Sequence, residues 1–456
     1  MTVGIRSCAI LVSLFLLGCA DSARHVGENE DARKAAPGAA TMPTIAGQAF
    51  APRVDHHLHL LSPAGAALST PPLLPEIKLP EELANFVRER NKRWHDQDGL
   101  AEIYTEGAIY FRGGTAAWAR GRRAAAGYVR WTISDTPYHI KPTTFNLEGS
   151  AANVAGYFVE ADGSDRHFGC FLFSLRKEPD GVWRCAAEMY RYQGAPHFEE
   201  PYTAKQVVAA LDSVRIQRGV VLSDAYYFDS VRPEPVPDEL DKVRAENDWT
   251  AAQVAEFPDR LVAFFSFNPL RDYALAELDR CVASGHFKGL KLHFNAAQLD
   301  FQDPAQVAKV RRVMAAANKH HLPIIIHVRS KPDYGRADAE VFLHELVAAA
   351  PDVPIQIAHL WGGENFSSSA LAVYADAFSS HDPLTRNLYF DISGAWSYAK
   401  PEEMPEIVAR IRQIGIGRIL YGSDAPPAEA WKAFREKLPL TEAEFRTIAS
   451  NVAPYL

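Results

Sequence analysis

Two histidines and an aspartate alternate along a short run of the chain. Residues 53–59 read Arg-Val-Asp-His-His-Leu-His, a pattern that predicts a β-strand. Because successive side chains of a strand point to opposite faces, Asp55, His57 and His59 share one face and His56 faces away. Two imidazoles on one strand end can hold a divalent cation such as Zn²⁺. Taken alone, the pair is equally consistent with a surface strand that binds nothing.

Three further residues of the same chemistry end predicted strands. His327 and His359 each follow a short apolar run, and Asp424 closes the last one. The carboxyl ends of strands in a parallel barrel meet at one rim, where such enzymes form their active sites. A lone histidine there is typical of a hydrogen-bonded core, but four histidines and an aspartate that converge favour metal ligands. Nitrogen and oxygen donors without thiolates suit Zn²⁺, Mn²⁺ or Fe²⁺ and argue against a closed structural zinc site.

Short apolar runs alternate with amphipathic stretches from about residue 206 onwards. This order predicts β-α units around a buried parallel sheet. An open doubly wound sheet is the alternative, but no Gly-x-Gly-x-x-Gly turn follows any strand. With the run at 53–59 there are eight predicted strands, so we expect an α/β fold, a TIM (β/α)8 barrel made of residues 51–79 and 201–456. The other seven runs lie at 219–222, 261–265, 289–293, 323–327, 354–359, 387–391 and 418–421.

The segment 80–200, between the first two predicted barrel strands, has a different pattern. An amphipathic helix is expected at 81–98, followed later by four alternating runs that predict an antiparallel sheet. The helices, Trp94, Asp98, Tyr104 and the hairpin at 171–184 resemble the SnoaL-like or nuclear-transport-factor-2-like family, which implies an inserted α+β cone-shaped domain. This domain leaves the barrel beside the rim, so we expect part of it to form a wall or a lid of the active-site pocket. Homo-oligomerisation through its open sheet is the alternative. The four runs lie near 138–147, 151–161, 166–176 and 182–192.

Five short motifs together resemble the amidohydrolase-related family of metal-dependent hydrolases. They occur in the family's order: Asp-His-His-Leu-His at 55–59, Gly-Leu-Lys-Leu-His at 289–293, His327, His-Leu-Trp-Gly-Gly at 359–363 and Gly-Ser-Asp at 422–424. The resemblance is to the compact branch of this superfamily, which contains hydrolases and nonoxidative decarboxylases. The insertion after the first strand departs from the usual pattern.

The chemistry and the resemblance suggest roles for these residues. His57, His59, His327 and Asp424 are expected to hold the metal and leave a position for water, with Asp424 as the base that takes the water proton. The resemblance implies that His359 orients this water or becomes a ligand of a second metal. It also implies that Lys291 bridges two metals as a carbamate, contacts substrate or is structural.

Weaker candidates lie around this set. His293 shares the face of Lys291 and is expected to contact substrate or pack below the metal. Arg329 could bind a carboxylate or phosphate, although an exposed loop arginine is the default expectation. Trp361 could line the substrate pocket or serve only packing. His56 is expected to be structural.

The first residues predict a targeting segment and not a membrane-spanning helix. Arg6 precedes an apolar stretch at 9–17 that is too short for a bilayer, and Leu-Leu-Gly-Cys follows at 16–19. These four residues resemble the bacterial lipobox, which implies a signal peptide at 1–18, a lipid on Cys19 and sorting to the outer membrane, facing the periplasm. Ordinary secretory cleavage is the alternative. Residues 19–50 are expected to be a tether.

Composition narrows the partners. The formal net charge is −8, and no block of basic residues could follow a phosphate backbone, so nucleic acid is excluded. A small-molecule substrate is expected instead. The first hypothesis is hydrolysis of an amide, ester or lactone with one or two divalent ions, Zn²⁺ first among them. The others are a metal-dependent decarboxylase of a small carboxylic acid and a non-catalytic surface binding module.

Overall fold

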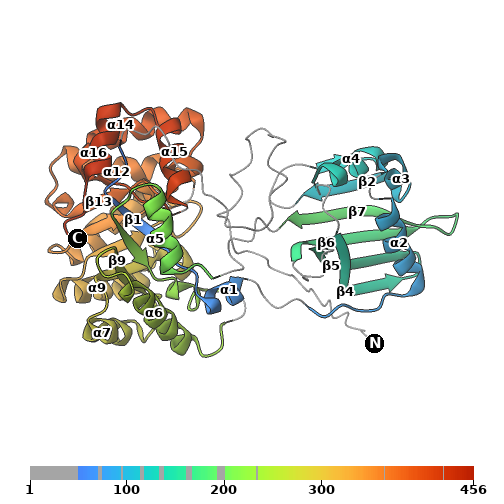
Figure 1. Cartoon of the computed structure of the whole chain (residues 1–456), viewed down its shortest axis with the longest axis horizontal. Coiled ribbons are helices and arrows are strands. Elements are labelled where there is room, and N and C mark those ends of the chain that lie inside the picture. Colours follow the sequence, from blue (N-terminus) through green and yellow to red (C-terminus); the bar gives the residue numbers. More distant parts are fainter. Residues whose placement is uncertain are drawn as a thin grey trace, which may run out of the picture. The chain divides into compact units, whose positions relative to one another are not determined.

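A computed structural model describes most of the chain. The described residues are 50–69, 74–93, 96–112, 118–132, 138–160, 167–192, 201–232, 235–363, 365–424 and 426–456. They form two compact units, one made of 50–69 with 201–456 and the other of 74–192 (Figure 1). The predicted signal peptide, the lipid site Cys19 and the predicted tether up to residue 49 lie outside the described residues. No helix in the described part is long and apolar enough to cross a membrane.

The first unit is an eight-stranded parallel sheet that closes into a barrel. Each strand pairs with the next in the order β1-β8-β9-β10-β11-β12-β13-β14. Backbone hydrogen bonds from His56 N to Tyr421 O (2.9 Å) and from Asp424 N to His57 O (2.9 Å) join β14 to β1. The predicted (β/α)8 barrel is therefore confirmed. The strands are β1 Val54–His59, β8 Arg218–Leu222, β9 Leu261–Ser266, β10 Gly289–His293, β11 Ile324–His327, β12 Ile355–Ile357, β13 Leu388–Asp391 and β14 Ile419–Leu420.

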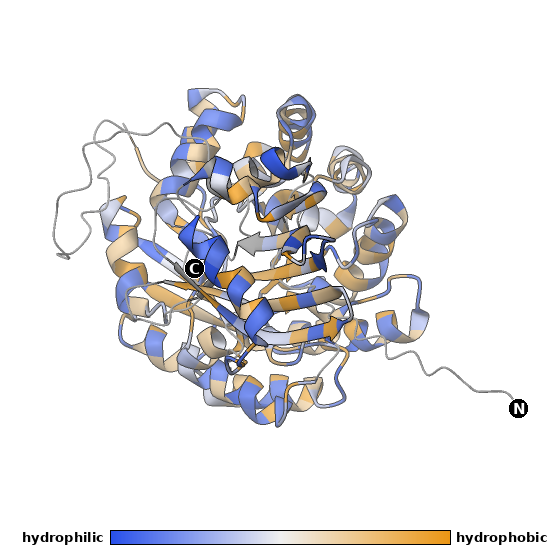
Figure 2. Cartoon of the chain, turned by 90° about the vertical axis from the view of Figure 1, so that its right-hand side faces the viewer, coloured by the Kyte–Doolittle hydropathy of each residue, from blue (hydrophilic) through white to orange (hydrophobic). Residues whose placement is uncertain are grey.

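Helices follow the strands and surround them (Figure 1). The barrel strands are short, and residues 324–326 of β11 are β-branched throughout, whereas several helices carry both apolar and polar residues (Figure 2). Some helix starts use local caps: Asp303, for example, accepts from the backbone N–H of Ala305 (2.9 Å) before α9 begins. The helices are α1 Pro63–Ser69, α5 Ala204–Ser213, α6 Glu239–Ala255, α7 Ala274–Ser284, α8 Phe294–Ala297, α9 Pro304–Lys319, α10 Arg336–Val341, α11 His359–Gly362, α12 Ser368–Ser379, α13 Ala395–Tyr398, α14 Met404–Ile414, α15 Pro427–Lys437 and α16 Glu442–Ser450.

Two apolar layers hold the barrel together. The larger one lies between the strands and the helices, and it includes Leu278, Ile326 and Trp431. The smaller one fills the barrel interior at the amino ends of the strands. The opposite ends of the strands carry the histidines and aspartates, so the apolar filling supports the polar rim.

The second unit is a six-stranded mixed sheet with three helices beside it. The strands follow the order β3-β2-β7-β6-β5-β4, with antiparallel pairing except between β2 and β7. The four predicted strands are confirmed, and the inserted α+β cone-shaped domain is confirmed as a fold. Ile77 and Leu79 pack with this unit, so it begins a few residues before the expected boundary at 80. Its elements are α2 Glu81–Lys92, α3 Gln97–Ala101, β2 Tyr104–Arg112, β3 Trp118–Arg120, α4 Arg122–Thr132, β4 Tyr138–Glu148, β5 Ala151–Glu160, β6 His167–Lys177 and β7 Trp183–Tyr192.

Candidate metal centre

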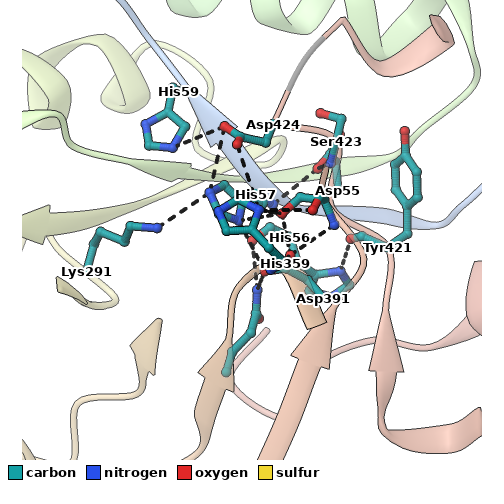
Figure 3. Close-up of polar contacts among 12 residues, drawn as sticks. Asp55, His56, His57, His59, Lys291, His359, Asp391, Tyr421, Ser423 and Asp424 are labelled. Atoms are coloured by element: carbon teal, nitrogen blue, oxygen red, sulfur yellow. Dashed lines mark hydrogen bonds and ion pairs between the residues drawn. The ribbon is translucent and has the colours of Figure 1, made fainter. Parts of the chain in front are cut away.

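Three of the predicted site residues form a tight group at the carboxyl ends of the barrel strands. His57, His359 and Asp424 each offer one ligand atom, and these atoms lie within 4.8 Å of one another (Figure 3). Asp424 Oδ1 is 3.8 Å from His57 Nε2, and Asp424 Oδ2 is 4.0 Å from His359 Nδ1. Both imidazoles are buried, whereas the Asp424 side chain is 24% exposed, so the group is open to solvent on the aspartate side.

The tautomer of His57 follows from its other neighbour. Its Nδ1–H donates to Asp391 Oδ2 at 3.1 Å, which leaves Nε2 with a lone pair that faces Asp424. Burial, together with the nearby Lys291 ammonium, lowers the pKa of His57 to about 3, so the ring is neutral at neutral pH. Two acceptor atoms therefore face each other, an arrangement that a cation between them would stabilise.

Asp391 holds both histidines of the group. Its Oδ1 accepts from the backbone N–H of His359 at 3.1 Å and from the Ser393 hydroxyl at 2.5 Å. The His359 Nδ1–H donates to the carbonyl oxygen of Ser393 at 2.9 Å. Burial opposes ionisation of Asp391, but His57 and these hydrogen bonds outweigh it and hold the pKa well below its usual range. The sequence analysis did not single out Asp391 or Ser393. Asp391 ends a predicted strand, as Asp424 does, so the same pattern could have identified it.

His59 lies beside the group and contacts it through Asp424. Its Nε2 is 3.5 Å from Asp424 Oδ1, and its Nδ1 is 2.7 Å from Asp224 Oδ1. Burial opposes protonation of His59, but the two carboxylates outweigh it and raise its pKa. His59 can therefore turn Nε2 towards a shared ion while Asp224 holds the other nitrogen. The sequence analysis did not single out Asp224 either. Its position two residues after the end of β8, at the same rim, could have identified it.

Lys291 points into the same space from β10 (Figure 3). Its Nζ lies 3.5 Å from His57 Nε2, and its side chain is buried. The sequence-based expectation that Lys291 belongs to the site residues agrees with this placement, while its chemical state stays a prediction.

His327 belongs to a neighbouring ring stack and not to the tight group. The register of β10 and β11 pairs His293 with His327, and their rings stack at 4.0 Å. The Tyr226 ring stacks on the other side of His293 at 4.5 Å, and the His327 ring meets His359 edge to face at 5.0 Å. The His327 ring therefore packs against the ring of His359, which belongs to the tight group.

The two remaining substrate candidates are engaged elsewhere. The Arg329 guanidinium donates to the carbonyl oxygens of Asn365 (2.6 Å) and Pro332, so it holds the two loops after β11 and β12 together. The Trp361 side chain is completely buried and packs edge to face on Phe366 at 5.0 Å. Neither side chain offers a surface to substrate in this arrangement.

His56 is structural, as its place on the strand indicated. Its Nδ1–H donates to Tyr421 O at 2.8 Å, and its Nε2 accepts from Ala453 N at 3.1 Å. Asp55 has a comparable role, because its Oδ1 accepts from Ser423 N at 2.9 Å and from His57 N at 3.1 Å. Burial raises the pKa of Asp55 to about 7.

The backbone is strained where the group is formed. His359, Leu360 and Asp424 have φ of 56°, 61° and 48°, in the left-handed region that non-glycine residues rarely adopt. Such residues persist only where their surroundings hold them, and they cluster at functional sites. Here the strain turns the side chains of His359 and Asp424 towards His57.

The donor set fits a divalent metal. Ligands about 2.1 Å from a tetrahedral ion stand roughly 3.4 Å apart, close to the separations of Asp424 from His57 and His59. The donors are imidazoles and a carboxylate, and the Nδ1 atoms of His57 and His359 are held by hydrogen bonds, as is usual for metal ligands. Burial opposes ionisation of Asp424, but the nearby histidines outweigh it and lower its pKa, which keeps an anion ready for a cation.

The sequence of the barrel matches a known family. The sequence model of the amidohydrolase family matches residues 231–451, so the chain carries an amidohydrolase domain. This family acts on small molecules, and its superfamily generally binds divalent metals. No protein with a curated function matches the chain.

Solved structures with a similar fold exist for both units. For the barrel they include a 2,6-dihydroxybenzoate decarboxylase in complex with 2,6-dihydroxybenzoate, at 20% identity and a TM-score of 0.40, covering 54% of this chain and 84% of that one. A 5-carboxyvanillate decarboxylase from Sphingomonas paucimobilis has 20% identity and a TM-score of 0.37, covering 53% and 79%.

For the second unit, a nuclear-transport-factor-2-like protein from Shewanella oneidensis MR-1 has 16% identity and a TM-score of 0.21, covering 24% of this chain and 97% of that one. At these values the likeness of all three concerns the fold and carries nothing about the reaction.

Proposed function

We propose that this protein is a metal-dependent hydrolase that cleaves an amide, ester or lactone bond of a small molecule. The observation that carries the proposal is the Asp424 carboxylate. It lies against His57, His59 and His359 and is the part of the tight group that reaches solvent. One carboxylate can thus share a metal and still accept a proton from water that arrives from outside.

The residues of the chain divide the work. His57 and His359, each held through Nδ1 and the Asp391–Ser393 pair, would bind the metal together with Asp424, and His59 would join them. A divalent metal bound there lowers the pKa of water towards neutrality and polarises the carbonyl group that is attacked. Asp424 takes the water proton, and Lys291 provides the buried positive charge that faces an anionic part of the substrate.

Zn²⁺ is the metal that we propose. It accepts imidazole and carboxylate ligands in tetrahedral sites that keep one position open. Within the described residues there is one group of three ligands, which favours a single ion. The ratio of metal to protein in the purified enzyme checks this number and shows whether Lys291 serves a second ion.

The placement of Arg329 removes one argument for decarboxylation, while Lys291 and the metal remain as cations that either reaction could use. A decarboxylase needs a cation that binds the carboxylate of its substrate, and the sequence offered Arg329 for this task. The structure has its guanidinium on two backbone carbonyl oxygens. Decarboxylation is therefore an outcome of the activity screen and not a second proposal.

The direct test is Asp424→Asn in the zinc-loaded protein. Asparagine fits the left-handed backbone of residue 424 but cannot act as a base, so we expect turnover to fall by about 10²- to 10⁴-fold while the circular dichroism spectrum stays unchanged. The screen uses esters, lactones, amides and aromatic acids, with Asp272→Asn as the control because Asp272 is 98% exposed. Normal hydrolysis by Asp424→Asn contradicts the mechanism, and release of CO₂ from an aromatic acid contradicts the reaction. No turnover of any compound favours a binding module.

A further inference from the structure

The segment that follows α16 closes the barrel interior at the amino ends of the strands. Ala453 and Tyr455 are buried there, and they belong to the same apolar cluster as Val54, Phe264 and Ile325. The Tyr455 ring meets the Phe264 ring edge to face at 5.4 Å. This segment thus supplies part of the core on which the metal centre rests.

The hydroxyl of Tyr455 reaches further into the barrel than its ring. It donates to Gln356 Oε1 on β12 at 2.6 Å. Because the amide oxygen of Gln356 accepts this hydrogen bond, its amide nitrogen must point the other way. The Gln356 side chain is buried.

Gln356 passes this orientation on to the metal centre. Its Nε2 donates to Asp391 Oδ2 at 2.6 Å, the oxygen that also accepts from His57 Nδ1 at 3.1 Å. Tyr455, Gln356, Asp391 and His57 therefore form one chain of hydrogen bonds, which we call the Tyr455 relay. It joins the amino-terminal end of the barrel to a candidate metal ligand at the carboxyl-terminal rim.

A second link from the same segment supports the neighbouring strands. The backbone N–H of Ala453 donates to His56 Nε2 at 3.1 Å, and His56 Nδ1–H donates to Tyr421 O at 2.8 Å. His56 and His57 are adjacent on β1. The segment therefore holds both the strand of His57 and the partner of its side chain.

We propose that Tyr455 is a positioning residue of the metal centre: its hydroxyl fixes the Gln356 amide, which fixes Asp391, which holds His57 with Nε2 towards the metal. The inference rests on the proposed metal binding and not on the reaction catalysed. Substituting a residue that forms a hydrogen bond with a metal ligand typically lowers the metal affinity by about 10- to 100-fold. Tyr455 acts two side chains further away than Asp391. Loss of its hydroxyl should therefore lower the metal affinity by a smaller but measurable factor.

The test compares two tyrosines that lose the same atom. Tyr455→Phe keeps the ring and removes only the hydroxyl. Tyr374→Phe is the matched control, because Tyr374 is also buried and its hydroxyl makes a 2.6 Å hydrogen bond, with Tyr334 and outside the relay. The zinc dissociation constant of each full-length variant is measured by competition with a chelator. The visible spectrum of the cobalt-substituted protein reports the ligand geometry.

We expect Tyr455→Phe to weaken zinc binding by about 3- to 10-fold and to alter the cobalt spectrum, whereas Tyr374→Phe changes neither. Gln356→Met should weaken zinc binding at least as much, and the double variant should be no worse than Gln356→Met, because the relay is already broken. Gln356→Met also tests the relay if Tyr455→Phe does not fold.

Zinc affinity of Tyr455→Phe equal to that of Tyr374→Phe overturns the proposal. The proposal is also overturned if the losses of zinc affinity from the two substitutions multiply in the double variant. Unchanged zinc affinity in Gln356→Met overturns it as well. These outcomes leave the proposed function intact, since the wild-type protein still binds zinc. A wild-type protein that binds no zinc overturns the proposed function and the relay with it.

Discussion

Burial decides which ionisable side chains of the barrel carry charge. Asp55 and His57 lie two residues apart on the same strand. Burial lowers the pKa of His57 to about 3 and raises that of Asp55 to about 7. Asp391 keeps its charge although it is buried, because His57 and the other hydrogen-bond donors around its two oxygens, five donors in all, hold its pKa low. Each charge state is thus set by partners that come from other strands.

Sequence reasoning found the candidate ligands but not the partners that orient them. His57, His359 and Asp424 were visible because their types are rare at strand ends. The contact between His57 and Asp391 joins residues 334 positions apart, and that between Tyr455 and Gln356 joins residues 99 apart. Such pairs depend on the register and tilt of the strands, which a local pattern does not contain.

Outside the metal centre, Asp229 predicts a pH dependence of stability. Its Oδ2 accepts from Asn268 N at 2.7 Å and from the Tyr273 hydroxyl at 3.0 Å. Burial, with Glu239 adding to it, raises the pKa of Asp229 to about 7, against about 3.9 in an unfolded chain. The folded protein therefore keeps the proton between pH 4 and 7 while the unfolded chain releases it.

The contribution of Asp229 to stability must then fall as pH rises from 4 to 7. One proton sets an upper limit of about 1.4 kcal/mol per pH unit. In urea unfolding at several pH values, Asp229→Asn should lack this loss, so its free energy of unfolding should rise relative to wild type across that range. The exposed Asp272→Asn should follow wild type. Parallel curves for wild type and Asp229→Asn contradict the prediction.

At the scale of elements, the barrel strands were predictable because they are buried on both sides. Their runs of isoleucine, valine and phenylalanine lie between turns, and all eight predicted starts fall within one residue of the observed ones, as at β10 and β14. The second unit was harder. The expected helix 81–98 ends at Lys92, and β2 and β3 were not predicted as strands, since β2 contains Gly107 and β3 has only three residues.

The turn after β12 shows how one element shapes the site. Gly363 has an extended backbone that any residue could adopt, so its requirement is steric. A Cβ at this position would lie 2.6 Å from His327 Nε2 and 2.7 Å from Arg329 Cβ. A side chain here would have to move His327, which packs on His359.

We therefore expect Gly363→Ala to lower turnover by on the order of 10- to 100-fold and to destabilise the fold by about 1–3 kcal/mol. Gly417→Ala is the control, because nothing lies within 4 Å of its added Cβ. Steady-state kinetics and urea unfolding measure the two effects. Wild-type turnover in Gly363→Ala would mean that the position of His327 does not matter for the reaction.

At the scale of the whole molecule, the barrel is interrupted once and rejoins itself. The chain enters the insertion after α1 and returns at Tyr202, whose backbone forms hydrogen bonds with Leu61 at 2.8 and 2.9 Å. The two ends of the barrel segment are thus held together two residues after His59. The lipid anchor at Cys19, by contrast, stays a prediction from the sequence, because it lies outside the described residues.

This connection makes it possible to remove the insertion and ask what it does. Joining residue 69 to residue 201 through a short Gly/Ser linker keeps α1, the Leu61–Tyr202 pairing and every candidate ligand. Since each unit has its own buried core, the shortened protein should fold and bind zinc like the full chain. If the insertion walls or covers the mouth, as we expect from the place where it leaves the barrel, substrate selectivity should fall, with kcat/KM for the preferred substrate reduced by about 10-fold or more. Kinetics across the substrate panel and the mass of the particle in solution separate the alternatives. Unchanged kinetics together with loss of an oligomer would assign the insertion to assembly and reject the lid.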